Sequence, residues 1–167
     1  MKDVELKLVC ELTRNSRKSD RELAKAINVS QPTVSRIRKK LEKEGMIDYS
    51  GIPNLAKLGY GIVAVVFGKR DYQKHPEIVT QKAKDFVKQH PNIIFGAAGL
   101  GLGYDRISIS IHKDYSDYFK FIQEIRVAWE GLMSVDSFLI DLTSKDVVQP
   151  LSLKQLVCSL EKKEKLG

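Results

Sequence analysis

Apolar side chains recur at helical spacing along residues 1–45, in three short stretches separated by polar breaks. Each stretch has one apolar face, which predicts three short helices that pack on one another. The first of these helices is expected over about residues 3–14. The inward positions are Val4, Leu8, Val9 and Leu12, then Leu23, Ala24 and Ile27, then Val34, Ile37 and Leu41.

Capping signals mark the ends of the second and third helices. Ser19 is followed three residues later by Glu22, a capping box that opens the second helix. Ser30 is placed to cap the third helix, and Pro32 suits its first turn because that turn needs no N–H from it. Gly45 stands where a left-handed residue ends the same helix.

The third helix presents a polar, cationic face outward when its apolar stripe packs on the first two helices. Short polar side chains near its start are of the type that reads base edges, and cations further along are of the type that meets phosphates. This pattern is typical of a helix-turn-helix with the third helix as recognition helix. The candidate DNA-binding residues are Ser30, Gln31, Pro32, Thr33, Ser35, Arg36, Arg38, Lys39, Lys40 and Lys43.

The second half of the chain changes to runs typical of strands, with two amphipathic helical stretches between them. Residues 61–69 are apolar and β-branched, and residues 104–112 alternate strictly, with Ile107, Ile109 and Ile111 on one face. The order βαββαβ is the split βαβ, ferredoxin-like plan. Strands are predicted over residues 61–69, 92–99, 104–112 and 135–142, and helices over residues 76–90 and 114–129.

Charge adds to this picture because it is uneven along the chain. The formal net charge is +7 and the pI is about 9.3. Residues 30–44 hold five Lys and Arg against two Glu. Binding of a polyanion by the third helix follows naturally from this concentration. A solvated, lysine-rich helix face is the other interpretation of the same charges.

Residue spacings do not support catalytic or metal chemistry. The chain has no P-loop, no HExxH and no Ser/His/Asp order. The histidines, His75, His90 and His112, are scattered and are expected to be structural or exposed. Cys10 and Cys158 lack metal-ligand spacing and are expected to be buried thiols. The sequence therefore predicts no enzyme, no metal site and no cofactor.

No stretch approaches the roughly 20 apolar residues that a membrane-spanning helix needs. The N-terminal residues MKDVELKL lack the apolar region of a signal peptide. A cytoplasmic location is therefore expected.

A series of motifs runs through the first 59 residues. They are Glu5, Leu8, Val9 and Leu12; Arg17; Glu22-Leu23-Ala24; Val29-Ser30; Val34, Arg36 and Ile37; Leu41-Glu42, Gly45 and Ile47; and Leu58-Gly59. Each is weak alone. In combination they resemble the N-terminal half of the Lrp/AsnC family, the leucine-responsive or feast/famine transcription factors of bacteria and archaea.

This resemblance implies an α+β chain with an N-terminal winged helix-turn-helix domain, to which a short strand predicted over residues 46–49 would belong. A ferredoxin-like βαββαβ domain (RAM-type) would follow; in the family it mediates dimerisation, often binds an amino acid or related effector, and commonly assembles dimers into octamers. The expected domains are the winged helix-turn-helix over residues 1–50, a linker over 51–58, the ferredoxin-like domain over 59–149 and a C-terminal helical extension over 150–167.

The loop GLGLGYDR corresponds to the family's Gly-x-Tyr-Asp region, near which the family's effectors lie. It is not a GxGxxG dinucleotide motif, because no strand-to-helix turn follows it. A glycine hairpin at a subunit interface is the alternative to a ligand contact. The candidate effector-binding residues are Gly101, Gly103, Tyr104 and Asp105.

The chain departs from the resembled family at its C-terminus, where members typically end near Pro150. Ser152 is a plausible N-cap, and Leu153, Leu156, Val157 and Leu160 then form one apolar helical stripe. A short helix needs a partner surface to be stable. We expect it to dock on the βαββαβ half of its own or a neighbouring subunit; a frayed tail is the alternative.

Pattern, charge and resemblance together predict a sequence-specific DNA-binding transcriptional regulator. Its partners would be double-stranded DNA and itself, as a homodimer or as a tetramer or octamer, with modulation by an amino acid or related effector. Two alternatives stay open: an architectural DNA-binding protein without effector, and a small-molecule sensor whose helical domain binds protein or RNA.

Overall fold

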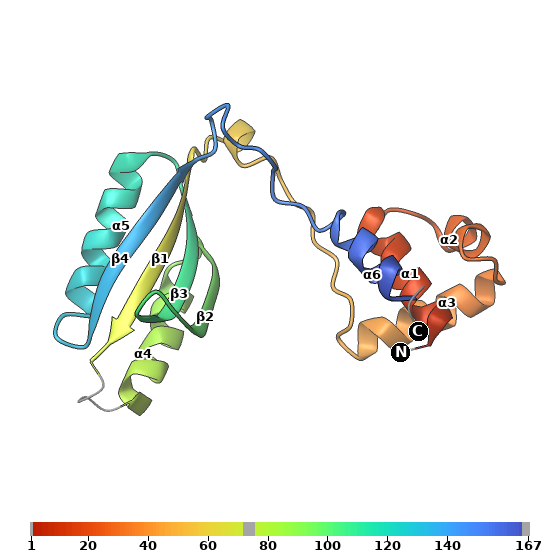
Figure 1. The fold of residues 1–167 in the computed structure, drawn as a ribbon, viewed down its shortest axis with the longest axis horizontal. Helices are drawn as coiled ribbons and strands as arrows, with labels where there is room; N and C mark the ends of the chain where they lie inside the picture. Colours follow the sequence, from red (N-terminus) through yellow and green to blue (C-terminus); the bar gives the residue numbers. More distant parts are fainter. Residues whose placement is uncertain (1, 72–75, 165–167) are drawn as a thin grey trace. The chain divides into compact units, whose positions relative to one another are not determined.

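The computed structural model describes residues 2–71 and 76–164, except for the side chains of residues 76–79 and 162–164. The chain forms two compact units, Met1–Ile52 together with Gln149–Gly167, and Pro53–Val148 (Figure 1). No helix in these described ranges is long and apolar enough to cross a membrane.

The first unit is helical, and three of its helices were predicted from the sequence. They are α1 (Asp3–Arg14), α2 (Asp20–Ala26) and α3 (Gln31–Lys43), followed near the C-terminus by α6 (Leu156–Glu164). Apolar residues of α1, α2 and α3 meet in a single core: Leu8, Leu12, Leu23, Ala24, Val34, Ile37 and Leu41. These are inward positions expected from helical spacing, so the predicted packing is confirmed.

The predicted caps are also formed. The Ser19 hydroxyl accepts a hydrogen bond from the Glu22 backbone N–H, and the Glu22 carboxylate accepts one from the Ser19 N–H at 2.7 Å. The Ser30 hydroxyl accepts from the Thr33 N–H at 3.4 Å. Gly45 follows α3 with a φ of +66°, the left-handed conformation that glycine adopts without strain.

The strand expected over residues 46–49 is not formed, and that prediction is wrong. A strand needs a neighbour to pair its backbone, and the strands that the structure describes all belong to one sheet of the second unit. The segment is held by a side chain instead, because the Arg38 guanidinium donates to the Tyr49 hydroxyl at 2.9 Å.

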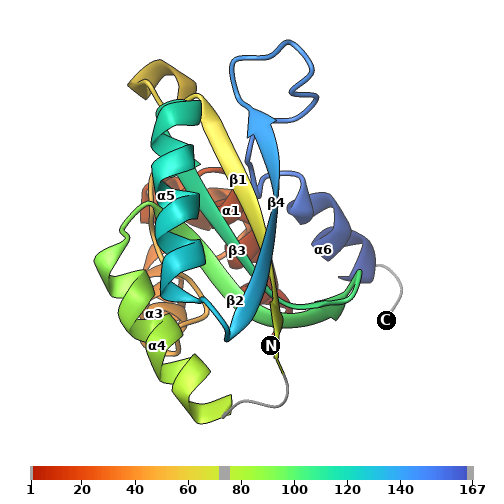
Figure 2. The ribbon, with the colours of Figure 1, turned by 90° about the vertical axis from the view of Figure 1, so that its left-hand side faces the viewer.

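The second unit is the predicted βαββαβ fold. Its elements are the short 3-10 helix η1 (Ala56–Leu58), β1 (Ile62–Arg70), α4 (Pro76–Gln89), β2 (Ile93–Gly101), β3 (Tyr104–His112), α5 (Tyr115–Ala128) and β4 (Met133–Asp141). The four strands form an antiparallel sheet in the order β2-β3-β1-β4. Both α4 and α5 cover the same face of this sheet (Figure 2).

Strand register decides which side chains lie under the helices. Ala64 lies opposite Ser110 and Val66 lies opposite Ser108, and both apolar residues belong to the core that α5 covers. Successive residues of a strand point to opposite faces. The alternating isoleucines of β3, such as Ile109 opposite Val65, therefore lie on the face without helices. We call this second face the open sheet face.

The C-terminal helix α6 packs on α1, so the expected docking on the βαββαβ half is wrong (Figure 1). Val157 and Cys10 are buried although neither belongs to the three-helix core, and we attribute their burial to this contact. Arg14 of α1 forms an ion pair with Glu161 of α6. Cys158 is exposed, which corrects the expectation that both thiols are buried.

Replacing Val157 by alanine should therefore destabilise the helical unit. Loss of a buried branched side chain costs about 1–3 kcal/mol. The neighbouring Leu156→Ala is the matched control, because 51% of Leu156 is exposed. Denaturant unfolding of the full chain measures both variants. Equal effects at the two positions would contradict the packing of α6 through Val157.

Candidate nucleic-acid interface

The exposed face of α3 carries three cations, Arg36, Lys39 and Lys43, on the side opposite its buried stripe. In the part of the chain that the structure describes, no carboxylate pairs with any of them. Their charges stay available to an outside anion. We call these three residues the free cations of α3.

The other two predicted cations of α3 are used within the domain. Arg38 Nη1 lies 2.7 Å from Asp20 Oδ1 on α2, and its guanidinium also lies over the Tyr49 ring at 5.3 Å. Lys40 Nζ lies 2.7 Å from Glu5 Oε1 on α1. The hydrogen bond from Lys40 holds the pKa of the largely buried Glu5 below its ordinary value. Arg38 and Lys40 thus fasten α3 to its two neighbours.

The polar residues at the start of α3 divide in a similar way. The hydroxyls of Ser30 and Thr33 lie 2.8 Å apart and take part in the helix cap. Gln31 and Pro32 are exposed, and Ser35 is half-buried on the same turn. The structure brings all ten sequence-predicted residues together on one helix and its cap. The remaining predicted residues make no polar side-chain contact with the described part of the domain: Gln31, Pro32, Ser35 and the free cations.

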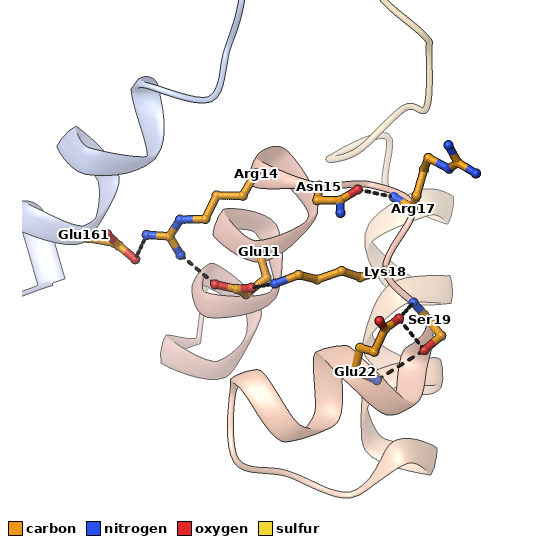
Figure 3. Close-up of polar contacts among 8 residues, drawn as sticks. All are labelled: Glu11, Arg14, Asn15, Arg17, Lys18, Ser19, Glu22 and Glu161. Atoms are coloured by element: carbon orange, nitrogen blue, oxygen red, sulfur yellow. Dashed lines mark hydrogen bonds and ion pairs between the residues drawn. The ribbon is translucent and has the colours of Figure 1, made fainter.

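Arg17 is one of the exposed cations outside α3 that were absent from the predicted set. Arg17 lies in the turn between α1 and α2, and its side chain points away from its neighbours (Figure 3). Its backbone N–H donates to Asn15 Oδ1 at 3.0 Å, which orders the turn. The adjacent Lys18 instead pairs with Glu11 on α1. A basic residue in an exposed polar turn is the sequence signal that identifies Arg17.

The candidate effector residues come together in the β2–β3 hairpin. Gly101 pairs with Tyr104 across a two-residue turn, in which Leu102 and Gly103 have φ of +53° and +80°. Positive φ at both positions matches a type I′ turn, whose backbone twist fits the right-handed twist of the two flanking strands. Glycine adopts a positive φ freely, whereas leucine adopts it only at a cost in conformational energy.

Two of these residues already have polar partners. The Tyr104 hydroxyl donates to Asp136 Oδ2 at 2.7 Å. Asp105 is buried, accepts from the Arg70 N–H at 3.0 Å and pairs with the Arg70 guanidinium. Burial raises the pKa of Asp105, but the bonds from Arg70 outweigh it and hold that pKa below its ordinary value. A ligand contact here stays a prediction.

The histidines act as packing residues where the structure describes them. The His112 ring is buried against Phe121, and its Nε2 lies 2.9 Å from the Ser110 hydroxyl. Burial lowers the pKa of His112. The His90 ring stacks on Phe86. His75 lies outside the described residues, and the described ones include no cluster able to hold a metal ion.

The division of α3 cations predicts that two similar substitutions differ in their effect on stability. Arg38→Met should lower the stability of the helical unit by about 1–2 kcal/mol, because Asp20 and Tyr49 lose a charged partner. Arg36→Met should leave it within about 0.5 kcal/mol, as expected for an exposed site. Unfolding curves of the two variants measure this, and equal losses would contradict the division.

Comparison with known proteins agrees with this geometry. A family model described as winged helix-turn-helix DNA-binding matches residues 1–48. An HTH-type transcriptional regulator of Pyrococcus furiosus is 32% identical over 124 residues, which are 74% of this chain and 80% of that protein. Another, of Pyrococcus abyssi, is 29% identical over 87% of this chain and 90% of that protein.

Solved structures share the fold at lower sequence identity. LrpC of Bacillus subtilis superposes with a TM-score of 0.68 at 20% identity, over 89% of this chain and 99% of that one. The leucine response regulatory protein LrpA of Mycobacterium tuberculosis gives 0.71 at 19% identity, over 91% and 99%. A Neisseria meningitidis transcriptional regulator, solved as a complex with L-Met, gives 0.75 at 18% identity, over 93% and 99%.

The named relatives are transcriptional regulators rather than enzymes, which confirms the prediction that the chain is not an enzyme. The Pyrococcus furiosus relative is similar over most of both chains, and the helix-turn-helix and the βαββαβ sheet are those of the Lrp/AsnC structures. The chain belongs to the Lrp/AsnC family of helix-turn-helix transcriptional regulators.

Proposed function

We propose that this regulator binds specific DNA sites as a homodimer or a larger assembly, with α3 of each subunit in the major groove. The observation that carries the proposal is the set of free cations, Arg36, Lys39 and Lys43, on the exposed face of α3. A cation with no internal partner breaks no ion pair when it binds a phosphate, and its binding releases counterions from the DNA.

Base recognition would fall to the first turn of α3. Gln31 offers an amide that can bond an adenine edge in two places, and Pro32 offers an apolar ring to a thymine methyl group. Both side chains are exposed beside the free cations. Arg17 lies in the turn before α2 and would add a phosphate contact outside α3. Arg38, Lys40 and the Ser30–Thr33 cap would hold the helix in position.

The open sheet face supports self-association. It carries Val63, Val65, Phe67, Phe95, Ile107, Ile109, Ile111, Phe138 and Ile140. Phe138 is 64% exposed and Phe95 is 51% exposed on this face, and large apolar side chains gathered on one exposed face are typical of an interaction site. A second copy of the same sheet would cover it with matching chemistry, as in a two-fold dimer. Two subunits would then present two α3 helices to two half-sites.

An effector is the third part of the proposal. The Neisseria meningitidis neighbour was solved with L-Met, and this chain has the same fold. We propose that an amino acid or related molecule contacts the β2–β3 hairpin at Gly101, Gly103, Tyr104 and Asp105. Because Asp105 already pairs with Arg70 and the Tyr104 hydroxyl already donates to Asp136, the backbone of the glycines would make the direct contacts, and the Tyr104 oxygen would be left as an acceptor.

Salt dependence of DNA affinity tests the proposed contacts. Eight cations in a dimer, the three free cations of α3 and Arg17 from each subunit, predict a slope of log K against log salt of about −7. Lys43→Ala removes two of them per dimer and should make the slope shallower by about 2. Lys120→Ala, on the exposed side of α5, is the control and should change nothing. A wild-type slope shallower than about −2 would contradict the proposal.

Footprinting of the protein on its own promoter separates specific regulation from an architectural role. Spaced, protected sites are expected for the regulator, and uniform coverage would favour the architectural alternative. No DNA affinity at all would favour a sensor with a protein or RNA partner.

Sedimentation tests the dimer. Phe138→Asp places a charge in the proposed contact and should convert the assembly to monomers, because an unpaired buried charge is costly. Phe119→Asp is the matched control, since Phe119 is 60% exposed on α5 and lies on the helical side of the sheet. A wild-type monomer at micromolar concentration, or dissociation by both variants alike, would contradict the proposed interface.

A further inference from the structure

A cavity of about 640 Å³ lies within the second unit, between α4, the sheet and the end of α5. Figure 2 shows α4 crossing the same sheet face as α5. We call this space the α4 cavity. It is separate from the β2–β3 turn, since Gly101, Gly103, Tyr104 and Asp105 do not line it. Its volume falls within the range of pockets that hold small organic ligands.

The cavity follows from the small residues that the sheet turns toward α4. Gly96 and Ser108 stand where larger side chains would fill the space, whereas at Gly68 the Met133 side chain already occupies the place of a Cβ. A Cβ added at Gly96 would meet no atom within 4 Å. From the helix, Phe86 reaches inward, with its ring centroid 6.2 Å from that of Trp129. Because the sheet residues that face α4 are short, the side chains of α4 do not fill the space between the helix and the sheet.

The walls are mainly apolar, and the charged residues that line the cavity are cationic: Lys84, Lys88 and Arg106. No Asp or Glu of the described residues lines it. Arg106 Nη1 donates to the Asp105 carbonyl at 2.8 Å and lies 3.7 Å from its carboxylate, which is already paired with Arg70. A guanidinium has five N–H donors, so Arg106 keeps donors for a further anion.

We propose that the α4 cavity binds a small monocarboxylate with an apolar body, such as an aliphatic acid. Arg106 would receive the carboxylate, and the apolar walls around Trp129 and Ile125 would receive the hydrocarbon. A free amino acid fits less well, because its ammonium group would find no carboxylate in the described lining. The site therefore differs in place and in ligand chemistry from the hairpin site proposed above.

Trp129 provides the readout, because it lines the cavity and is the only tryptophan in the chain. The full-length protein is titrated with 4-methylpentanoate and with octanoate while tryptophan fluorescence is recorded. A saturable change is expected for both acids. 4-Methylpentanamide and leucine have the same apolar body as 4-methylpentanoate. The amide lacks the carboxylate, and leucine carries an additional ammonium group without a partner in the cavity. Each should therefore bind about tenfold more weakly than 4-methylpentanoate.

Matched variants locate the binding. Gly96→Leu fills the cavity and should weaken carboxylate binding at least tenfold, whereas Gly99→Leu on the same strand lies outside the lining and should not. Arg106→Gln should weaken it about tenfold. Lys120→Gln removes a charge from α5 outside the lining and should have no effect. Far-UV circular dichroism confirms that each variant is folded.

No saturable change with either acid would overturn the proposal, as would carboxylate binding that survives both Gly96→Leu and Arg106→Gln. If Gly96→Leu fails to fold, Arg106→Gln and the acid–amide comparison decide. Leucine that binds equally in wild type and Gly96→Leu would belong to the hairpin. The titration contains no DNA, so its outcome is independent of the DNA-binding proposal; only an effect of the acid on DNA affinity rests on that proposal.

Discussion

Burial of the apolar stripe of α3 is the interaction on which the rest of the first unit depends. Val34, Ile37 and Leu41 pack against α1 and α2, and this packing alone determines which side of α3 faces outward. The ion pairs of Arg38 and Lys40 then fasten the helix at two points. The same polar face therefore holds cations that stabilise the domain beside cations that are free to meet DNA.

Features encoded by neighbouring residues were predictable from the sequence. Helical spacing and the Ser19 and Ser30 caps located the first three helices to within a few residues, because caps and periodicity are local effects. The βαββαβ order followed from the change between helical and strand periods. The candidate residues on α3 also came together, since helix geometry places them on one side.

Features that depend on contacts between distant segments were not predictable. Helix α6 was recognised as amphipathic, but its docking on α1 depends on the burial of Val157 and Cys10, 147 residues apart. Residues 46–49 have strand-like side chains but no strand beside them. The alternating isoleucines of β3 predicted one apolar face without saying which, and register places it away from the helices. Helical spacing alone puts Arg36 opposite the buried stripe and Arg38 beside that position, but it could not give Arg38 its partners Asp20 and Tyr49, which are distant in sequence.

The central claim, that the free face of α3 contacts DNA, is tested most directly by lysine acetylation footprinting. The full-length protein is acetylated with and without its DNA site, and modification is read by mass spectrometry. Lys39 and Lys43 should be protected by DNA, while Lys120 on α5 should react equally in both samples. Equal acetylation of Lys39 and Lys43 with and without bound DNA would contradict the account.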